Sequence, residues 1–196
     1  MSALVGHQTR IQVGRRSVLT LADVLPEEAP MRMLIIGKTP APGSVKAGHY
    51  FQGRQGRFLW NELKALHILE IADEEFEDDA LVHQGFGVTD VAKIPRNAGS
   101  EPGRGEYEDG WAVVAATIDR LKPDLLFWPY KRTLDSVLRL ALRDPRPTRY
   151  GFNPNLNRVF GRGVFVFGMM GTPCRKELRI RTMRALRRRL RQRRDT

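Results

Sequence analysis

Short apolar segments alternate with helix-patterned segments along the chain, and this alternation limits the possible folds more than any other feature. Strand-like runs occur at 34–36, 87–92, 123–128 and 164–167. Apolar residues recur at helical spacing over 58–69, 106–121 and 133–142, and a last helix is expected over 175–194. Strands that alternate with helices predict a parallel sheet covered on both faces. We therefore expect an α/β fold with three layers, α/β/α, around a central four-stranded parallel sheet.

The N-terminal segment differs from the rest of the chain. Residues 1–30 are weakly patterned, so we expect an arm there, with a short helix at 21–25 that ends at Pro26. A chain of 196 residues with 41% hydrophobic residues fits one domain with its own core. We place this domain at 31–190, and 191–196 are expected to form a basic tail.

The charge of the chain points to a polyanionic partner. The net charge is +11, and residues 175–194 hold ten arginines and one lysine. Such a balance favours nucleic acid, with a solvated basic surface as the alternative. Within this helix an apolar stripe can dock on the sheet: Leu178, Met183, Leu186 and Leu190. A basic helix at a membrane surface is a rival interpretation.

Membrane, metal and disulfide functions find little support in the sequence. No apolar run approaches the ~20 residues of a membrane span, and the N-terminal residues lack the apolar core of a signal peptide. One cysteine, Cys174, excludes an internal disulfide, a four-cysteine cluster and a cysteine zinc site. The four histidines show no metal-ligand spacing. We expect a cytoplasmic monomer, in a bacterial cytosol or nucleoid, with no metal and no cofactor.

A long loop punctuated by glycine, residues 37–58, follows the first apolar strand. In open α/β sheets, ligands bind beyond the carboxyl ends of the strands. This loop, Thr89–Asp90 and the segment 168–175 should therefore converge on one cleft. The loop lacks both GxxxxGK[ST] and GxGxxG, which weakens the case for a nucleoside triphosphate or dinucleotide site.

Four motifs in this order resemble those of the uracil-DNA glycosylase superfamily, in particular its mismatch-specific uracil/thymine-DNA glycosylase branch. The branch has a G-x-N-P-G turn, a glycine-aromatic-x-Phe step and N-R-F-W, which here fall on 37–41, 48–51 and 56–59. Residues 87–95 resemble the strand GVTxL and 121–131 a third strand. The closing motif N-P-S-G-L-S-R falls on 169–175, where only Arg175 matches well. The resemblance covers about 31–190 and implies the uracil-DNA glycosylase fold with one DNA groove.

The resemblance implies hydrolysis of the N-glycosidic bond of uracil, or of another deaminated base, in DNA, with no cofactor. Its implied catalytic residues are Asp90, Thr39 and His49. Phe51 would stack on a flipped base and Asp90 would face the hydrogen-bonding edge of that base. The remaining implied base contacts come from Gly37, Lys38, Ala41 and Ser44. The implied DNA contacts are Arg57, Thr172, Pro173, Cys174, Arg175 and Lys176, of which 172–175 would form the wedge that fills the vacated space.

Two residues depart from the family pattern. Thr39 stands where the family places the Asn that positions water, and a hydroxyl does not readily serve as a general base. Asp90, the only carboxylate expected at the pocket floor, stands where Asn or a cation is usual, and burial can keep a carboxyl protonated. A weakly or non-catalytic protein that binds damaged or abasic DNA therefore stays an alternative. The basic C-terminal helix leaves an RNA- or ribosome-associated basic protein open as well. For His49, a solvent-exposed position in the loop is the alternative to a catalytic one.

Overall fold

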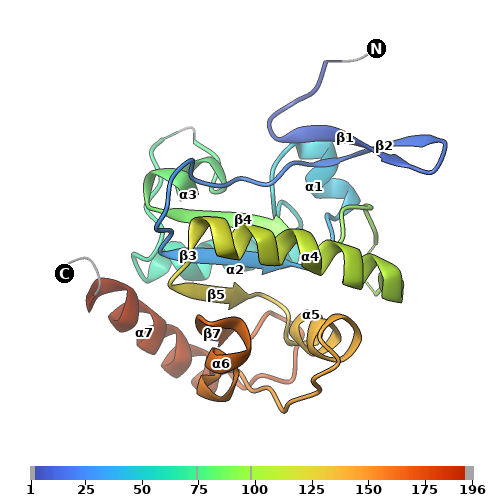
Figure 1. Ribbon diagram of the computed structural model, residues 1–196. Coiled ribbons are helices and arrows are strands. Elements are labelled where there is room, and N and C mark those ends of the chain that lie inside the picture. Colours follow the sequence, from blue (N-terminus) through green and yellow to red (C-terminus); the bar gives the residue numbers. More distant parts are fainter. Residues whose placement is uncertain (1–2, 74, 98, 193–196) are drawn as a thin grey trace.

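The computed structural model describes residues 3–73, 75–97 and 99–192, and a five-stranded sheet lies at its centre (Figure 1). The strand order is β4 (Phe86–Asp90), β3 (Met33–Gly37), β5 (Leu125–Trp128), β7 (Gly163–Val166) and β6 (Gly151–Phe152). The first four strands are parallel, whereas β6 pairs antiparallel with β7. The sequence predicted four parallel strands but not the fifth, antiparallel edge strand, because the two residues of β6 are too few to show a pattern. The three-layer α/β/α fold is confirmed.

Each parallel strand is buried on both faces and contributes to two separate cores. Side chains alternate between the faces of a strand, so Met33 and Ile35 join one core while Leu34 and Ile36 join the other. The first core includes α2 (Arg54–Ala65), α3 (Asp79–His83) and α7 (Lys176–Gln192). The second includes α4 (Arg104–Leu121), α5 (Lys131–Ser136), the π-helix η1 (Val137–Ala141) and α6 (Asn157–Phe160). A 3-10 turn, η2 (Pro154–Leu156), precedes α6.

The N-terminal segment forms a β-hairpin, not an arm with a helix. Strands β1 (Gln8–Val13) and β2 (Arg16–Leu21) pair antiparallel around Gly14, which has a positive φ of 59°. The helix expected at 21–25 is wrong, because Val24 instead exchanges two backbone hydrogen bonds with Val88 of β4, at 3.0 and 2.8 Å. Figure 1 shows the hairpin above α1 (Pro42–Ala47), a helix that begins at a proline inside the glycine loop.

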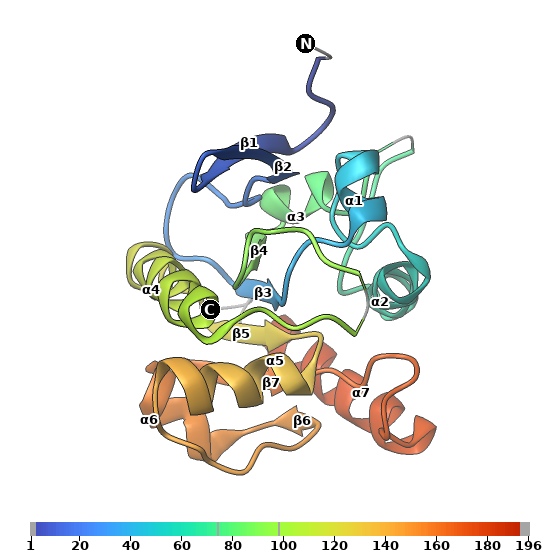
Figure 2. The same ribbon diagram turned by 90° about the vertical axis from the view of Figure 1, so that its right-hand side faces the viewer.

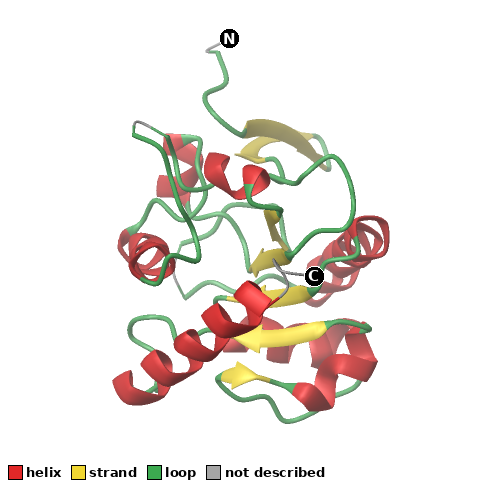
Figure 3. Cartoon of the chain, turned by 90° about the vertical axis from the view of Figure 1, so that its left-hand side faces the viewer, coloured by secondary structure: helices red, strands yellow, loops and turns green. Residues whose placement is uncertain are grey.

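Helix α7 crosses one face of the sheet from the carboxyl ends of the strands toward their amino ends (Figure 3). Met183, Leu186 and Leu190 are buried against the sheet, whereas Leu178 is only half-buried. The far end is tied to the start of β3, since Arg32 Nη2 donates to the Leu190 carbonyl at 3.0 Å. The predicted tail at 191–196 begins within α7, and 193–196 lie outside the described residues.

Within the described part of the chain, the helices are too short or too polar to cross a membrane.

Candidate active site

A cavity of about 790 Å³ opens at the carboxyl ends of the four parallel strands, the edge that faces the viewer in Figure 2. Loops that follow all four strands line it. The predicted site residues in its wall come from three places: Lys38, Thr39, Ala41, Ser44 and Phe51 after β3, Asp90 at the end of β4, and Thr172 and Pro173 after β7. The topology therefore gathers segments that are more than 130 residues apart in the chain.

Gly37, the last residue of β3, lies where Asp90 and Phe51 converge. A Cβ atom at Gly37 would overlap Oδ1 of Asp90 and would lie 3.4 Å from Cζ of Phe51. The two strands pair in register at this point, Gly37 opposite Asp90. Because a side chain here would displace the carboxylate, glycine is required for Asp90 and the Phe51 ring to meet at the cavity.

Phe51 has an unusual backbone conformation for a residue with a large side chain. Its φ is +58°, and its half-buried ring meets the Trp60 ring edge-on with centroids 5.6 Å apart. The turn is fixed on both sides, because the Gln52 amide donates to Ser44 Oγ at 3.1 Å and Trp60 Nε1 donates to the Tyr50 carbonyl at 3.1 Å. Positive φ is uncommon outside glycine, and such strained residues cluster at functional sites. The loop thus holds the Phe51 ring in a fixed position in the cavity wall.

Asp90 is an acid in the cavity wall whose pKa is strongly raised. Its side chain is 2% exposed, and burial raises its pKa to about 7, with Lys93 lowering the pKa and Asp23 raising it by smaller amounts. Among the described residues, none donates a hydrogen bond to this carboxyl group. Tyr130, also in the cavity wall, has a pKa raised to about 12 by burial and then by the charge of Asp90. Asp90 can therefore gain or lose a proton near neutral pH and has free hydrogen-bonding capacity.

The hydroxyl of Thr39 is occupied by a bond between two loops. Oγ1 donates to the carbonyl oxygen of Ile94 in the loop after β4. The same two loops are joined by the amides of Ala92 and Arg96, which donate to the carbonyls of Lys38 and Pro40 at 2.9 and 3.0 Å. Thr39 therefore has a structural partner, and only the lone pairs of its oxygen remain for a water molecule.

A second carboxylate, which the sequence did not predict, lines the cavity beside Asp90. Glu101 pairs with Lys38 Nζ at 3.2 Å and with Arg132 Nε at 3.3 Å, and Tyr107 donates a hydrogen bond to its Oε2 at 3.1 Å. Glu101 comes from a segment without periodicity or motif, and Arg132 stands between the motif at 121–131 and the helix pattern at 133–142, so neither was singled out from the sequence. The two cations neutralise Glu101, which leaves Asp90 as the unpaired acid.

Several predicted residues lie outside the cavity. His49 is buried and its Nδ1 contacts Oδ1 of Asp78 at 3.0 Å, so we remove it from the candidate catalytic set. Cys174 is buried, and burial raises the pKa of its thiol, so it does not form part of an exposed wedge. Arg57, Arg175 and Lys176 are exposed but do not line the cavity.

The loop before α7 lines the cavity through Thr172 and Pro173, so the helix begins near the cavity. The helix has 17 residues and is therefore roughly 25 Å long. Its far end lies beside Arg32, at the opposite edge of the sheet. The arginines near Leu190 are thus far from the cavity. The basic residues next to the site are Arg175 and Lys176 at the start of α7, together with cavity-lining side chains from other elements: Lys38, Arg54, Arg96 and Arg132.

The fold and the cavity define a three-layer α/β protein with a ligand site at the carboxyl ends of its strands, the place where such sheets bind ligands. The family model of the uracil DNA glycosylase superfamily matches residues 26–168, which is most of the chain. The protein belongs to this superfamily. It is similar to a G/U mismatch-specific uracil DNA glycosylase of Schizosaccharomyces pombe, at 26% identity over 137 residues. The match covers 68% of this chain but only 42% of that relative.

Proposed function

We propose that the protein hydrolyses the N-glycosidic bond of uracil, or of another deaminated base, in DNA and leaves an abasic site. The main support is the convergence of Phe51 and Asp90 over Gly37 in the wall of a cavity of about 790 Å³. This volume lies within the range of pockets that enclose small ligands, roughly 300–1,000 Å³. A nucleotide turned out of the duplex brings its base into such a pocket.

The two side chains have complementary tasks in this reaction. The Phe51 ring offers a flat apolar face on which a base can stack. The ionised Asp90 carboxylate accepts a hydrogen bond from an N–H group of the base or stabilises the positive charge that develops on the sugar. The C–N bond breaks with its electron pair going to the base, and water adds to the sugar cation and releases a proton.

A panel of oligonucleotides tests this proposal. Duplexes with uracil opposite guanine or adenine, hypoxanthine or xanthine are incubated with the protein and then treated with alkali, which cleaves abasic sites. We expect strand breaks at the modified position of at least one duplex and none in unmodified DNA. Intact strands in every duplex would contradict the enzymatic proposal.

A second candidate function is the binding of damaged or abasic DNA with little catalysis. The observation in its favour is the bond from the Thr39 hydroxyl to the Ile94 carbonyl, because it occupies the side chain at the family's water-positioning place. Tight, selective binding to abasic duplexes in the absence of strand breaks would support this candidate over the first.

The expected effect of Thr39→Ala is small. Because the hydroxyl is bonded to Ile94, its removal loosens the contact between two loops and removes no proton acceptor of useful strength. We expect the single-turnover excision rate to fall by less than about tenfold, a loss smaller than that of a general acid or base. Thr39→Ser keeps the hydroxyl and serves as the matched control. If Thr39→Ala abolishes excision while its melting temperature is unchanged, the hydroxyl positions the attacking water.

DNA affinity should depend on the charges at the cavity end of α7 and not on those at its far end. Removing Arg175 and Lys176 together should weaken DNA binding and reduce the slope of log affinity against log salt by about two, since each phosphate contact contributes about 0.9. The matched control removes Arg188 and Arg191, which are equally exposed but lie beside the far edge of the sheet. Equal losses in both double variants, measured by fluorescence anisotropy, would show that DNA also covers the far end.

A further inference from the structure

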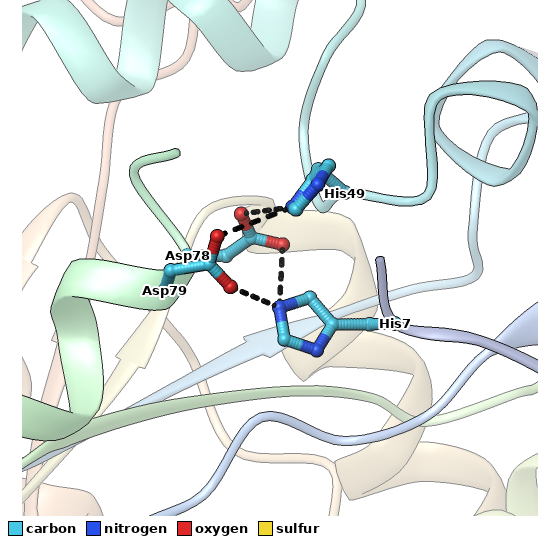
Figure 4. Close-up of side chains that lie close together, drawn as sticks. All are labelled: His7, His49, Asp78 and Asp79. Carbon is cyan, nitrogen blue, oxygen red and sulfur yellow. Dashed lines mark hydrogen bonds and ion pairs between the residues drawn. The ribbon is translucent and has the colours of Figure 1, made fainter. Parts of the chain in front are cut away.

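Two histidines from distant parts of the sequence meet a pair of neighbouring aspartates outside the cavity (Figure 4). His7 precedes the hairpin, His49 follows α1, and Asp78 and Asp79 stand at the start of α3. One ligand atom of each lies within 4.8 Å of the others. We propose that these four residues bind a divalent transition metal ion of the zinc class, and that the ion fastens the N-terminal hairpin to the domain.

Each of the two carboxylates lies close to both imidazole rings. His7 Nε2 lies 2.7 Å from Asp79 Oδ1, and His49 Nδ1 lies 3.0 Å from Asp78 Oδ1. The cross distances are 3.7 Å from His7 Nε2 to Asp78 Oδ2 and 3.8 Å from His49 Nδ1 to Asp79 Oδ2. Zinc bonds of about 2.0–2.1 Å in a tetrahedron separate neighbouring ligand atoms by roughly 3.4 Å. The two cross distances are close to this value and the two shorter distances lie below it. The four contacts involve both oxygens of each aspartate, so each carboxylate turns one oxygen toward the ion when it binds.

The surroundings hold the ligands in place, as outer-shell groups do at metal sites. Asp78 is fully buried, and its Oδ2 accepts a hydrogen bond from the Tyr50 amide at 2.7 Å. The His49 ring stacks on the Phe76 ring with centroids 3.6 Å apart. The side chain of His7 is 25% exposed, which provides a path by which an ion enters.

The charge balance also favours a cation. Two adjacent carboxylates, one of them fully buried, repel each other unless a positive charge lies between them. A divalent ion neutralises both carboxylates and binds neutral imidazoles, and imidazole with carboxylate is a ligand set that suits zinc. Spacing along the sequence predicted no metal site because long segments separate His7, His49 and the Asp78–Asp79 pair, and only the fold brings them together.

The ion would bridge two parts of the chain that already touch. The His7 amide donates to the Gly48 carbonyl at 2.8 Å, and Gln8 Nε2 donates to the Val45 carbonyl at 2.7 Å. His49 does not line the cavity, so the ion would contribute to stability and not to the chemistry of base removal.

The test uses the untagged chain of 196 residues, titrated with Zn²⁺ and with Co²⁺ as the spectroscopic probe. We expect one metal ion per chain, visible Co²⁺ absorption bands of a tetrahedral site, and a melting temperature that rises with zinc. His7→Gln and Asp79→Asn alter partly exposed side chains, so both variants should fold, and each should lower the metal affinity at least tenfold. His83→Gln is the control, because His83 is an exposed histidine in the same helix α3.

Two outcomes would overturn the proposal. One is a wild-type chain that binds neither ion and whose melting temperature does not change with zinc. The cluster would then be stabilised only by hydrogen bonds between the imidazoles and the carboxylates. The other is equal metal affinity in His7→Gln and His83→Gln, which would place the ion elsewhere. Neither outcome depends on whether the protein removes bases from DNA.

Discussion

Asp90→Asn should lower the single-turnover rate of base excision roughly 100-fold, the scale of losing one well-placed catalytic group. The carboxyl group is buried, lines the cavity beside Phe51, and receives no hydrogen bond from the described residues. Asparagine has almost the same shape but no charge, so it removes the stabilisation of a sugar cation without opening space. Excision kinetics with enzyme in excess over the best duplex measure this effect.

Glu101→Gln provides the comparison for Asp90→Asn, because Glu101 is the other carboxylate in the cavity wall. Lys38 and Arg132 already neutralise it, so we expect a loss of less than about tenfold. A larger loss for Glu101→Gln than for Asp90→Asn would show that the wrong acid has been assigned.

The raised pKa of Asp90 gives the same prediction a pH dependence. Burial raises this pKa from 3.8 to about 7, so the excision rate should rise with pH through about 7 and then level off. Asp90→Asn should remove this step. The free energy of unfolding should change with pH in the opposite direction to the excision rate. Because the folded state binds the Asp90 proton more tightly than the unfolded state, the stabilisation that is complete below about pH 4 is lost as the pH rises to about 7. Thermal unfolding of both proteins at pH 5 and pH 8 separates the two effects.

Phe51→Ala should reduce excision by at least about tenfold, because stacking on an aromatic ring is worth roughly 1–3 kcal/mol per base. The Phe51 ring lines the cavity and also contacts Trp60, so the melting temperature must be measured for each variant. Phe51→Tyr retains the flat face and should keep most of the activity, whereas Phe51→Leu retains the apolar volume and should not. Full activity of both Phe51→Ala and Phe51→Leu would show that the ring only fills the core.

The central strands were predictable because β3, β4, β5 and β7 are buried on both faces and therefore appear as apolar runs. The edge strand β6 was not, since Gly151 and Phe152 form no pattern. The hairpin was missed because only the end of β2, at Thr20 and Leu21, is buried, and because Val18 and Leu19 are adjacent apolar residues that break the alternation. Alternation of apolar residues indicates a strand only where one face meets a core.

The location of the site could be predicted from the topology of the sheet. Many of the residues that line it could not be predicted. Gly37, Asp90 and the loop after β7 end parallel strands, so they meet at one edge of the sheet. The direction in which a loop side chain points is decided by tertiary contacts, as His49 shows by turning away from the cavity toward Asp78. Glu101 belongs to a segment whose sequence has no pattern, and only the fold brings it to Lys38 and Arg132.

Release of the free base tests the central proposal most directly. A duplex with a single uracil opposite guanine is mixed with excess protein, and free uracil and alkali-labile sites are quantified over time in the same samples. We predict that uracil appears in a one-to-one ratio with abasic sites, and about 100-fold more slowly for Asp90→Asn. Binding of the duplex without release of uracil, or equal rates for the wild-type protein and Asp90→Asn, would contradict the role proposed for this cavity.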